Sequence, residues 1–595
     1  MLHRRLRVLD TSPRADQPMI RGEGHVVAMV YNGEVYNYRT LREELEQGGW
    51  QFTTSSDAEV LLVGFKAWGH TVFSRARGMW AAAFWESAEQ RLTLARDPVG
   101  KKPLVYSAIG GRMIFGSTVP SVLALMDGVP QIDRNALDCY LGHLVVPHEH
   151  SIFRGIHKVP PGCIVTWIVG GQPHTTRYWA PPSPVQSGLD RGEVVAEIER
   201  LLRSAVRRRL ESDVPLGVFL SAGFDSGIVA ALAAQESGRP LVAVTAGTTG
   251  SVHDERSSAS SVAQRHGLEH RPLEVPALSA ATLPLLMAEI GEPFGDSSIL
   301  PSYEVALAAR REMTVALTGD GGDEAFFGYA SFRGVHLAAA YRKVLPQSIR
   351  QALWRMTRRI STDDWRRRVA ALCEYGAAPL ARSFRNRMGF APDERARLLR
   401  GMGNGHEHAA EHIYSERLDR LAGLPDAEAL RRTWYETYLP NDYLTKVDVA
   451  TMSASLEARC PFLDIDLVEF ALRLPQSVSF PGGQLKALLR PLATGLLPSV
   501  VLARPKTGFS VPVSDWLRGP LRPALEEFVF RRGTLMSDLV DPGEARAVWD
   551  AHCRGADHGT RVWALLALGV WCAVVVERRW AGGDPLPFAQ SAATR

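Results

Sequence analysis

The chain has 595 residues, too many for one hydrophobic core, and the usual domain size of about 100 to 200 residues predicts two to four domains. Its 46% hydrophobic and 22% charged residues exclude a disordered chain. A net charge of +4 cannot supply the concentrated positive field that nucleic acid or an anionic membrane surface requires, so we expect neither as a partner.

The cysteine pattern and the apolar segments indicate a soluble protein of the cytoplasm. The six cysteines are scattered without CxxC spacing, which disfavours a zinc site or a disulfide framework. The basic start is followed by Asp10 and Pro13 rather than by an apolar run, so no secretory signal is expected. The longest apolar stretch, 562–576, is shorter than the roughly 20 residues that span a bilayer, and a buried C-terminal helix is the preferred interpretation.

Short apolar runs broken by Gly, Asn and Asp dominate the first 180 residues. They predict strands at 25–31, 79–85, 92–95, 104–106 and 113–116. One segment, 39–47, has helical periodicity. This part therefore reads as a layered α+β domain.

A Pro- and Ser-rich segment separates this part from the rest. Pro181-Pro182-Ser183-Pro184 and Ser187-Gly188 resist regular structure, and such composition marks domain boundaries. We expect one domain at 1–180 and a second at 190–595.

Helical and strand patterns alternate after this boundary. A helix is predicted at 194–210, and strands at 214–220, 241–245 and 314–318 have helical stretches between them. That alternation predicts an α/β domain with a parallel sheet covered by helices. The following segment, 331–430, is Arg-rich and helical, and its charges are expected to form a solvated face.

The loop Ser221-Ala222-Gly223-Phe224-Asp225-Ser226-Gly227 lies between a predicted strand and a predicted helix at 228–234. Its backbone N–H groups and the positive end of the helix would converge where a phosphate group could sit. A purely structural strand-to-helix turn is the alternative, since a lone Gly- and Ser-containing turn is a weak signal.

Two further polar turns follow predicted strands, His253-Asp254-Glu255 and the segment 318–324. In a parallel sheet such turns gather at the carboxyl edge, where α/β proteins bind ligands, so three of them favour a nucleotide site. Asp225 and Asp323 are then candidate Mg²⁺ ligands, because this ion binds through one or two carboxylates with phosphate oxygens and water. Helix capping is the alternative for each aspartate alone.

Several longer motifs occur in a fixed order in the first part. They are His3-Arg4-Arg5-Leu6 with Val8-Leu9-Asp10 and Gln17-Pro18-Met19, then Tyr31-Asn32-Gly33-Glu34-Val35-Tyr36-Asn37, Ser56-Asp57-Ala58-Glu59-Val60, Gly78-Met79-Trp80-Ala81, and the segment 96–104 with Gly100-Lys101-Lys102-Pro103. The second part continues with Leu439-Pro440-Asn441-Asp442-Tyr443-Leu444-Thr445-Lys446-Val447-Asp448, Ser455-Leu456-Glu457-Ala458-Arg459-Cys460-Pro461-Phe462-Leu463-Asp464 and Arg504-Pro505-Lys506-Thr507-Gly508-Phe509.

With these motifs the chain resembles the glutamine-hydrolysing asparagine synthetases and their relatives among the pyrophosphate-loop amidotransferases. The resemblance implies an Ntn hydrolase-like, layered αββα glutamine amidotransferase type 2 domain, incomplete at its N-terminus, followed by an asparagine synthetase-type ATP pyrophosphatase domain with a helical C-terminal part. It also implies that a carboxylate attacks the α-phosphate of ATP, that pyrophosphate leaves, and that ammonia attacks the acyl-adenylate. ATP and Mg²⁺ are thus the implied cofactors, and glutamine or ammonia and a carboxylate such as aspartate the implied substrates, with a homodimer possible.

The same resemblance implies roles for individual residues. The residues matching glutamine-holding positions are Arg5, Asn32, Gly33, Glu34 and Asp57. An arginine can bind the carboxylate of glutamine through two parallel hydrogen bonds, and acidic side chains can bind the ammonium group of glutamine. The residues matching ATP or pyrophosphate contacts are Leu220, Ser221, Gly223, Asp225, Ser226, Ala246, Thr318 and Gly319.

Five charged residues are further candidates for the implied synthetase site. Asp323 would help to bind Mg²⁺, Lys506 would neutralise pyrophosphate, and Asp320 matches an acidic position tied to formation of the intermediate. Lys486 and Lys446 are weaker candidates, with a solvated surface lysine as the alternative.

The chain departs from the family pattern at two places. Residue 2 is leucine and the first cysteine is Cys139, whereas the family begins its glutaminase half with a nucleophilic cysteine; a start assigned too far downstream or a real loss would explain this. Ala222 stands where the family usually has glycine, and Gly227 where it has serine. A methyl group at 222 would narrow the anion's approach if the position needs positive φ, and Gly227 removes one hydroxyl donor.

Three functions remain open on the sequence. The first is amidation of a free carboxylate, aspartate by default, with ammonia from glutamine if the full-length protein has its cysteine. The second is the same chemistry on a specialised metabolite or peptide with another amine. The third is a non-catalytic ATP-binding relative.

Overall fold

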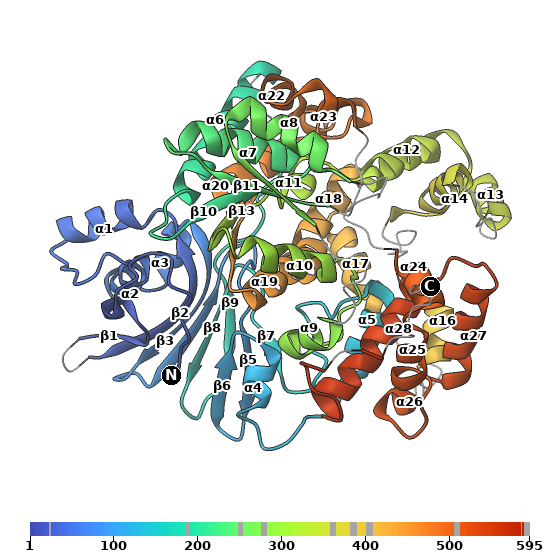
Figure 1. Cartoon of the computed structure of the whole chain (residues 1–595), viewed down its shortest axis with the longest axis horizontal. Coiled ribbons are helices and arrows are strands. Elements are labelled where there is room, and N and C mark those ends of the chain that lie inside the picture. Colours follow the sequence, from blue (N-terminus) through green and yellow to red (C-terminus); the bar gives the residue numbers. More distant parts are fainter. Residues whose placement is uncertain are drawn as a thin grey trace, which may run out of the picture.

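A computed structural model describes residues 1–22, 25–185, 188, 190–247, 254–274, 282–357, 364–380, 389–399, 409–504, 512–584 and 586–587. Two antiparallel sheets lie in the N-terminal part, shown in blue at the lower left of Figure 1, and a parallel sheet lies beside them. The N-terminal strands are β1 (Met19–Arg21), β2 (Val27–Val35), β3 (Gly78–Glu86), β4 (Arg91–Arg96), β5 (Val105–Ile109), β6 (Arg112–Gly116), β7 (His157–Lys158), β8 (Cys163–Ile168) and β9 (His174–Arg177).

The N-terminal part is layered. Helices α1 (Tyr38–Gln47) and α2 (Asp57–Trp68) share a core with the sheet of order β1-β2-β3-β4-β8-β9. The opposite face of that sheet packs on the sheet of order β6-β5-β7, which contacts α4 (Val119–Leu123) on its other side. The expected αββα layering is therefore confirmed.

Helix α2 was not predicted from the sequence, and the reason is physical. Its residues from Asp57 to Phe65 are all buried, so the segment lacks the one-sided apolar stripe that identifies a surface helix. Strand β2 also extends four residues past its predicted end at 31, and thereby carries the Asn32-Gly33-Glu34 motif.

The second part contains a five-stranded, wholly parallel sheet of order β12-β11-β10-β13-β14, which confirms the predicted α/β architecture. Its strands are β10 (Leu216–Phe219), β11 (Val242–Gly247), β12 (Glu269–Glu274), β13 (Val315–Leu317) and β14 (Glu457–Arg459). Only β10, β11 and β13 were predicted. Strand β12 is polar and contains Pro272, as edge strands do, and β14 is a three-residue buried strand with two charged side chains, so neither has an apolar signal.

Helices cover both faces of the parallel sheet (Figure 1). On one face Val218 and Leu317 share a core with α6 (Arg191–Arg209) and α7 (Phe224–Glu236). Val244 and Ala316 point the other way, into a core with α9 (Leu283–Ile290) and α10 (Ile299–Ala309). The alternation of neighbouring residues between the two cores is that of a strand buried on both sides.

The remaining helices form the helical C-terminal part and the connections. They are α3 (Val72–Arg75), α5 (Arg134–His143), α8 (Arg256–His266), α11 (Gly322–Ala325), α12 (Ala330–Val344), α13 (Gln347–Thr357), α14 (Asp364–Ala377), α16 (Pro392–Leu398), α17 (Ala409–Arg420), α18 (Asp426–Glu436), α19 (Leu444–Ser453), α20 (Ile465–Arg473), α21 (Gln476–Ser479), α22 (Arg490–Leu496), α23 (Ser499–Ala503), α24 (Val513–Arg518), α25 (Arg522–Phe528), α26 (Leu535–Leu539), α27 (Pro542–Cys553) and α28 (Gly559–Trp571).

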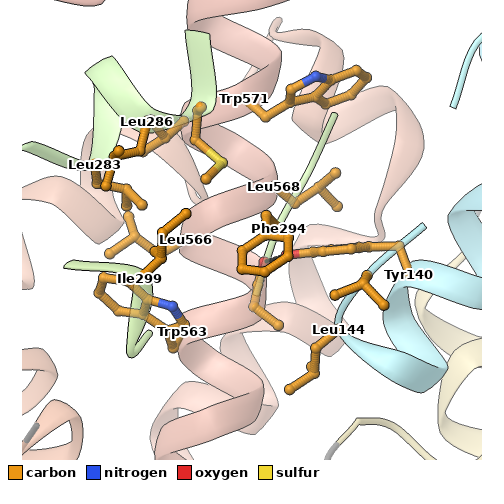
Figure 2. Close-up of a cluster of buried hydrophobic side chains, with 14 of the residues drawn as sticks. Tyr140, Leu144, Leu283, Leu286, Phe294, Ile299, Trp563, Leu566, Leu568 and Trp571 are labelled. Atoms are coloured by element: carbon orange, nitrogen blue, oxygen red, sulfur yellow. Dashed lines mark hydrogen bonds between the residues drawn. The ribbon is translucent and has the colours of Figure 1, made fainter. Parts of the chain in front are cut away.

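Helix α28 and the π-helical turn Cys572–Val576 after it lie in the largest core. Figure 2 shows Trp563 and Trp571 of α28 among side chains of α9 and of the segment around α5, and the Tyr140 hydroxyl donates to the Ala564 carbonyl oxygen at 2.7 Å. Gly559–Val576 is the one helical stretch of the described residues that is long and apolar enough to cross a membrane, and 78% of it is buried inside the protein. The expectation of a buried C-terminal helix is confirmed.

The expectation that the charges of 331–430 form a solvated face is wrong for Arg395. This side chain is 2% exposed, and its guanidinium contacts Asp138 and Glu411, both at 2.6 Å. A buried guanidinium requires such carboxylate partners, and Asp138 lies on α5 of the N-terminal part. Arg395 therefore joins the helical part to the N-terminal part.

Candidate active site

The loop after β10 leads directly into a helix. Helix α7 begins at Phe224, four residues earlier than predicted, so Asp225 and Ser226 lie in its first turn and Gly227 lies inside it. The Ser221 and Ser226 hydroxyls are 2.7 Å apart, and Ser221 Oγ also accepts from the Gly223 N–H at 3.1 Å. The two serines therefore fix the loop at the positive end of the helix.

The loop meets the turn that follows β13. A Cβ on Gly319 would lie 2.6 Å from the backbone nitrogen of Ser226, and one on Gly322 would lie 2.7 Å from Asp225 Cγ. Both positions thus need glycine because of close approach between the two turns. The third turn, after β11, also reaches the loop, since the Ala222 N–H donates to Glu255 Oε2 at 3.0 Å. The three turns meet at the carboxyl edge of the sheet, as expected, although His253 lies outside the described residues.

Two carboxylates converge on one lysine at this edge. Lys486 Nζ is 2.5 Å from Asp225 Oδ2 and 2.7 Å from Asp323 Oδ1. Burial alone would lower the pKa of Lys486, but the two aspartates outweigh it and raise the pKa above its usual range. Lys486 is 9% exposed, so the alternative of a solvated surface lysine is wrong for this residue.

The arrangement fits Mg²⁺ and a nucleotide. Asp225 and Asp323 supply two carboxylates beside a helix N-terminus, and Mg²⁺ completes its shell with phosphate oxygens and water. The described residues hold no cluster of three or more His, Cys, Asp or Glu that could bind a metal ion. Leu220 is buried at the end of β10, Ala246 lies near the end of β11, and Lys506 lies outside the described residues.

Asp320 occupies a second cluster on the turn after β13. The Thr318 hydroxyl donates to Asp320 Oδ2 at 2.8 Å and lies 3.3 Å from Cys460 Sγ. The Thr318 N–H donates to the Arg459 carbonyl oxygen at 2.8 Å, which fixes this turn to the end of β14. Sequence reasoning assigned no role to Cys460, because a lone cysteine within a longer motif carries no signal of its own.

Lys446 is also buried, at 7% exposure, so the surface alternative is wrong for it too. Its Nζ contacts Asp296 Oδ2 at 2.7 Å and Ser298 Oγ at 2.9 Å. Burial and the neighbouring Asp296 raise the pKa of Asp442 well above its usual range, whereas Lys446 keeps the pKa of Asp296 low despite burial. The group therefore consists of an Asp296–Lys446 ion pair with Asp442 beside it, and burial favours the protonated form of Asp442.

The candidate glutamine-holding residues lie around β2 and the start of α2. Asp57 Oδ2 accepts from the Tyr31 hydroxyl at 2.7 Å and from the Val35 N–H at 2.9 Å, while Glu34 lies 3.3 Å from Arg459. Burial is the main cause that raises the pKa of both carboxyl groups. Each has protein partners, and Arg459 comes from the parallel sheet.

The other members of this set lie nearby but make separate contacts. Arg5 donates to the Leu9 carbonyl oxygen at 2.5 Å and lies 3.7 Å from Asp16. Asn32 and Gly33 pair with Ala81 and Trp80 of β3, and a Cβ on Gly33 (φ 151°) would lie 2.1 Å from the Met79 carbonyl oxygen. The structure thus brings Glu34 and Asp57 together and gives Arg5 other partners.

Known proteins match the chain over most of its length. The family model for asparagine synthase matches residues 197–573, and that for a glutamine amidotransferase domain matches residues 1–179. A protein of Mycobacterium tuberculosis named "Putative asparagine synthetase (glutamine-hydrolyzing)" is 32% identical, with 96% of this chain and 88% of that protein covered.

More distant relatives carry two kinds of name. Asparagine synthetase (glutamine-hydrolyzing) 1 of Bacillus subtilis is 29% identical, with 97% and 90% covered. Amidase chyE of Penicillium rubens is 24% identical, with 91% and 85% covered. Among solved structures, the glutamine phosphoribosylpyrophosphate amidotransferase of B. subtilis overlaps 39% of this chain and 49% of its own at a TM-score of 0.22.

Proposed function

Because the chain belongs to the asparagine synthase family and is a ligase of that type, we propose that it adenylylates a carboxylate with ATP and converts the activated acyl group to an amide. One observation carries this proposal, the convergence of Asp225 and Asp323 on Lys486 beside the N-terminus of α7. The division into domains at 1–180 and 190–595 belongs to the proposal as well.

The residues around α7 suit the departure of pyrophosphate. Its charge would be met by the N–H groups at the start of α7 and by Lys486, and cations and oriented dipoles act most strongly where charge develops in the transition state. Asp225 and Asp323 would hold Mg²⁺, which supplies Lewis-acid stabilisation of phosphate oxygens when bound. Lys506 remains a proposed partner in this role.

Asp320 is proposed to serve the second half of the reaction. Its Oδ2 is fixed by the Thr318 hydroxyl on the turn that also contacts the loop 221–227, which we call the phosphate loop. A carboxylate held in this way can orient an amine and accept its proton as the amide bond forms. We propose aspartate as the default acceptor and ammonia, drawn from glutamine when a catalytic cysteine is available, as the nucleophile.

Release of pyrophosphate tests the proposal. Purified protein is incubated with ATP, Mg²⁺, ammonium and one carboxylate at a time, including aspartate and larger carboxylic acids because one matched relative is named an amidase rather than a synthetase. We expect carboxylate-dependent formation of AMP and pyrophosphate. Binding of ATP–Mg²⁺ by calorimetry with no turnover on any acceptor would instead support a non-catalytic relative.

A further inference from the structure

Lys101 belongs to the N-terminal part but lies at the edge of the parallel sheet. It sits in the turn after β4, where Asp97 accepts backbone N–H bonds from Val99, Gly100, Lys101 and Lys102 at 2.8 to 3.0 Å. Asp97 is fully buried. Four bonds to one carboxylate make this a rigid turn, so the position of the Lys101 backbone is fixed.

The side chain of Lys101 is 5% exposed, and its Nζ is buried without an oxygen or nitrogen partner among the residues that the structure describes, beside the weakly accepting thiol of Cys460. Burial alone would lower the pKa of Lys101, but Cys460, Asp448 and Asp320 together raise it above its usual value, so the group is an ammonium ion. An ammonium has three donors and no acceptor, and leaving it buried and unpaired is costly.

The neighbouring lysine shows that this cost is avoidable. Lys102 is 1% exposed and its Nζ donates to Asp448 Oδ1 at 2.8 Å. The same turn therefore carries one buried ammonium with a carboxylate partner and one without. A buried ammonium that lacks a carboxylate partner beside one that has it calls for an explanation, and an external anion would supply the missing partner.

Lys101 faces the residues expected to act on the substrate. Asp320 and Cys460 are among the groups that act on its charge, and both belong to the cluster around Thr318. The turn that holds Asp320 contacts the phosphate loop through Gly319, which approaches Ser226. Lys101 thus lies beside the place where phosphate chemistry would occur without being part of the phosphate loop.

We propose that the Lys101 ammonium group binds a carboxyl oxygen of the acceptor, so that the N-terminal part contributes a substrate-binding residue to the amide-forming site. This inference rests on the proposed function. A singly charged carboxylate suits the position better than a phosphate, because Asp320 and Asp448 lie near and would repel a group with several negative charges. The phosphates have their own cation in Lys486.

The test is Lys101→Met in the full chain, assayed by pyrophosphate release at saturating ATP–Mg²⁺ over a series of concentrations of the best carboxylate. Hydrogen bonds to charged groups contribute about 1.5 to 3 kcal/mol, so the KM for the carboxylate should rise about 10- to 100-fold. The KM for ATP should stay at the wild-type value, and the melting temperature should stay the same or rise, because the variant removes a buried charge that has no carboxylate partner. Lys101→Arg should recover part of the carboxylate affinity, and Lys66→Met, a half-buried lysine of the N-terminal part with backbone carbonyl partners, is the matched control.

Each other outcome overturns the inference. A wild-type carboxylate KM in Lys101→Met, or a raised KM for ATP alone, would show that the ammonium serves another purpose. If Lys101→Met fails to fold, Lys101→Gln, which keeps a donor and lacks the charge, takes its place, and misfolding of both would assign Lys101 a structural role. A wild type that never releases pyrophosphate refutes the proposed function and the inference with it, whereas an active wild type with an unaffected Lys101→Met refutes the inference alone.

Discussion

The two candidate sites use their charged side chains differently. Around β2, Glu34 faces Arg459, and Asp57 accepts hydrogen bonds from Tyr31 and Val35, so the acidic groups bind other parts of the protein. At the parallel sheet, two carboxylates from separate turns meet at one lysine beside a helix N-terminus. The difference teaches that matching a motif does not fix a role, because the same side chain can hold a ligand or join two parts of the chain.

Arg459→Met tests the joining role and should have the largest effect. Arg459 is fully buried, donates to Glu457 Oε1 at 2.8 Å and to the Arg209 carbonyl oxygen at 2.9 Å, and faces Glu34. Removing one partner of a buried charge pair costs about 3 to 5 kcal/mol, so the urea midpoint should fall steeply. Arg473→Met, whose exposed pair with Glu469 should contribute less than about 1 kcal/mol, is the control.

Equal midpoints for these two variants would contradict the joining role. Glu34→Gln tests the same contact by changing the acidic partner of Arg459. Because burial already favours the protonated form of Glu34, this variant should fold normally, and a selective loss of glutamine binding, measured by calorimetry, with ammonium-dependent turnover intact would restore the ligand-holding role.

Asp323→Asn probes the other site and should have the next largest effect. The change keeps the volume but removes one of the two carboxylates at Lys486. Loss of one electrostatic group at a charge-developing centre costs about 10²- to 10³-fold in rate, so pyrophosphate release should fall by about that factor. Its free energy of unfolding, measured by urea titration, should stay within about 1 kcal/mol of the wild-type value, since Lys486 retains Asp225. A variant with full activity would remove Asp323 from the site.

The sequence predicted the buried apolar strands but not the buried charged side chains, because the two leave different patterns in the sequence. Strands β10, β11 and β13 and the layered N-terminal part were predicted because apolar runs report burial directly. Buried charge gives no such signal, so Arg395 and Lys486 were taken as candidates for solvated positions although both have carboxylate partners far away in the sequence. The unpaired state of Lys101 likewise depends on which carboxylates fold near it, and no local pattern encodes that.

The pH dependence of stability should report on the contacts of the N-terminal part. Burial lowers the pKa of His143 and of His148 to about 4, and His143 Nε2 contacts the Ala410 carbonyl oxygen at 2.6 Å. Between about pH 6.5 and 4, these two histidines bind protons in the unfolded chain but stay neutral in the folded chain. The contribution of the two neutral histidines to the free energy of unfolding is therefore complete above about pH 6.5 and is lost as the pH falls toward 4.

The His143→Gln variant isolates this contribution. Its unfolding free energy should decline less steeply than that of the wild type, by up to about 1.4 kcal/mol per pH unit in this window. His174→Gln, which replaces an exposed histidine on β9, should follow the wild type. Parallel curves for all three proteins in urea titrations at pH 7, 5.5 and 4.5 would show that His143 titrates normally in the fold.

The smallest effect concerns the unusual residues of the phosphate loop. Ala222 does not have a positive φ, so its methyl group causes no backbone strain there. At Gly227, inside α7, an added Cβ would lie 2.9 Å from Leu497 Cδ2. A serine at 227 would therefore press on an apolar side chain, and overpacking of this kind costs about 1 kcal/mol or somewhat more.

Gly227→Ser and Gly227→Ala should then lower the urea midpoint alike and leave ATP affinity, measured by calorimetry, at the wild-type value. The pair is matched because only the hydroxyl distinguishes the two variants. If the serine variant alone bound ATP more tightly, by the factor of about 2 to 10 that one hydrogen bond provides, the hydroxyl missing from this loop would be a phosphate donor after all. In that case the site at the parallel sheet, and not only the one around β2, would lack a ligand contact that its motif implies.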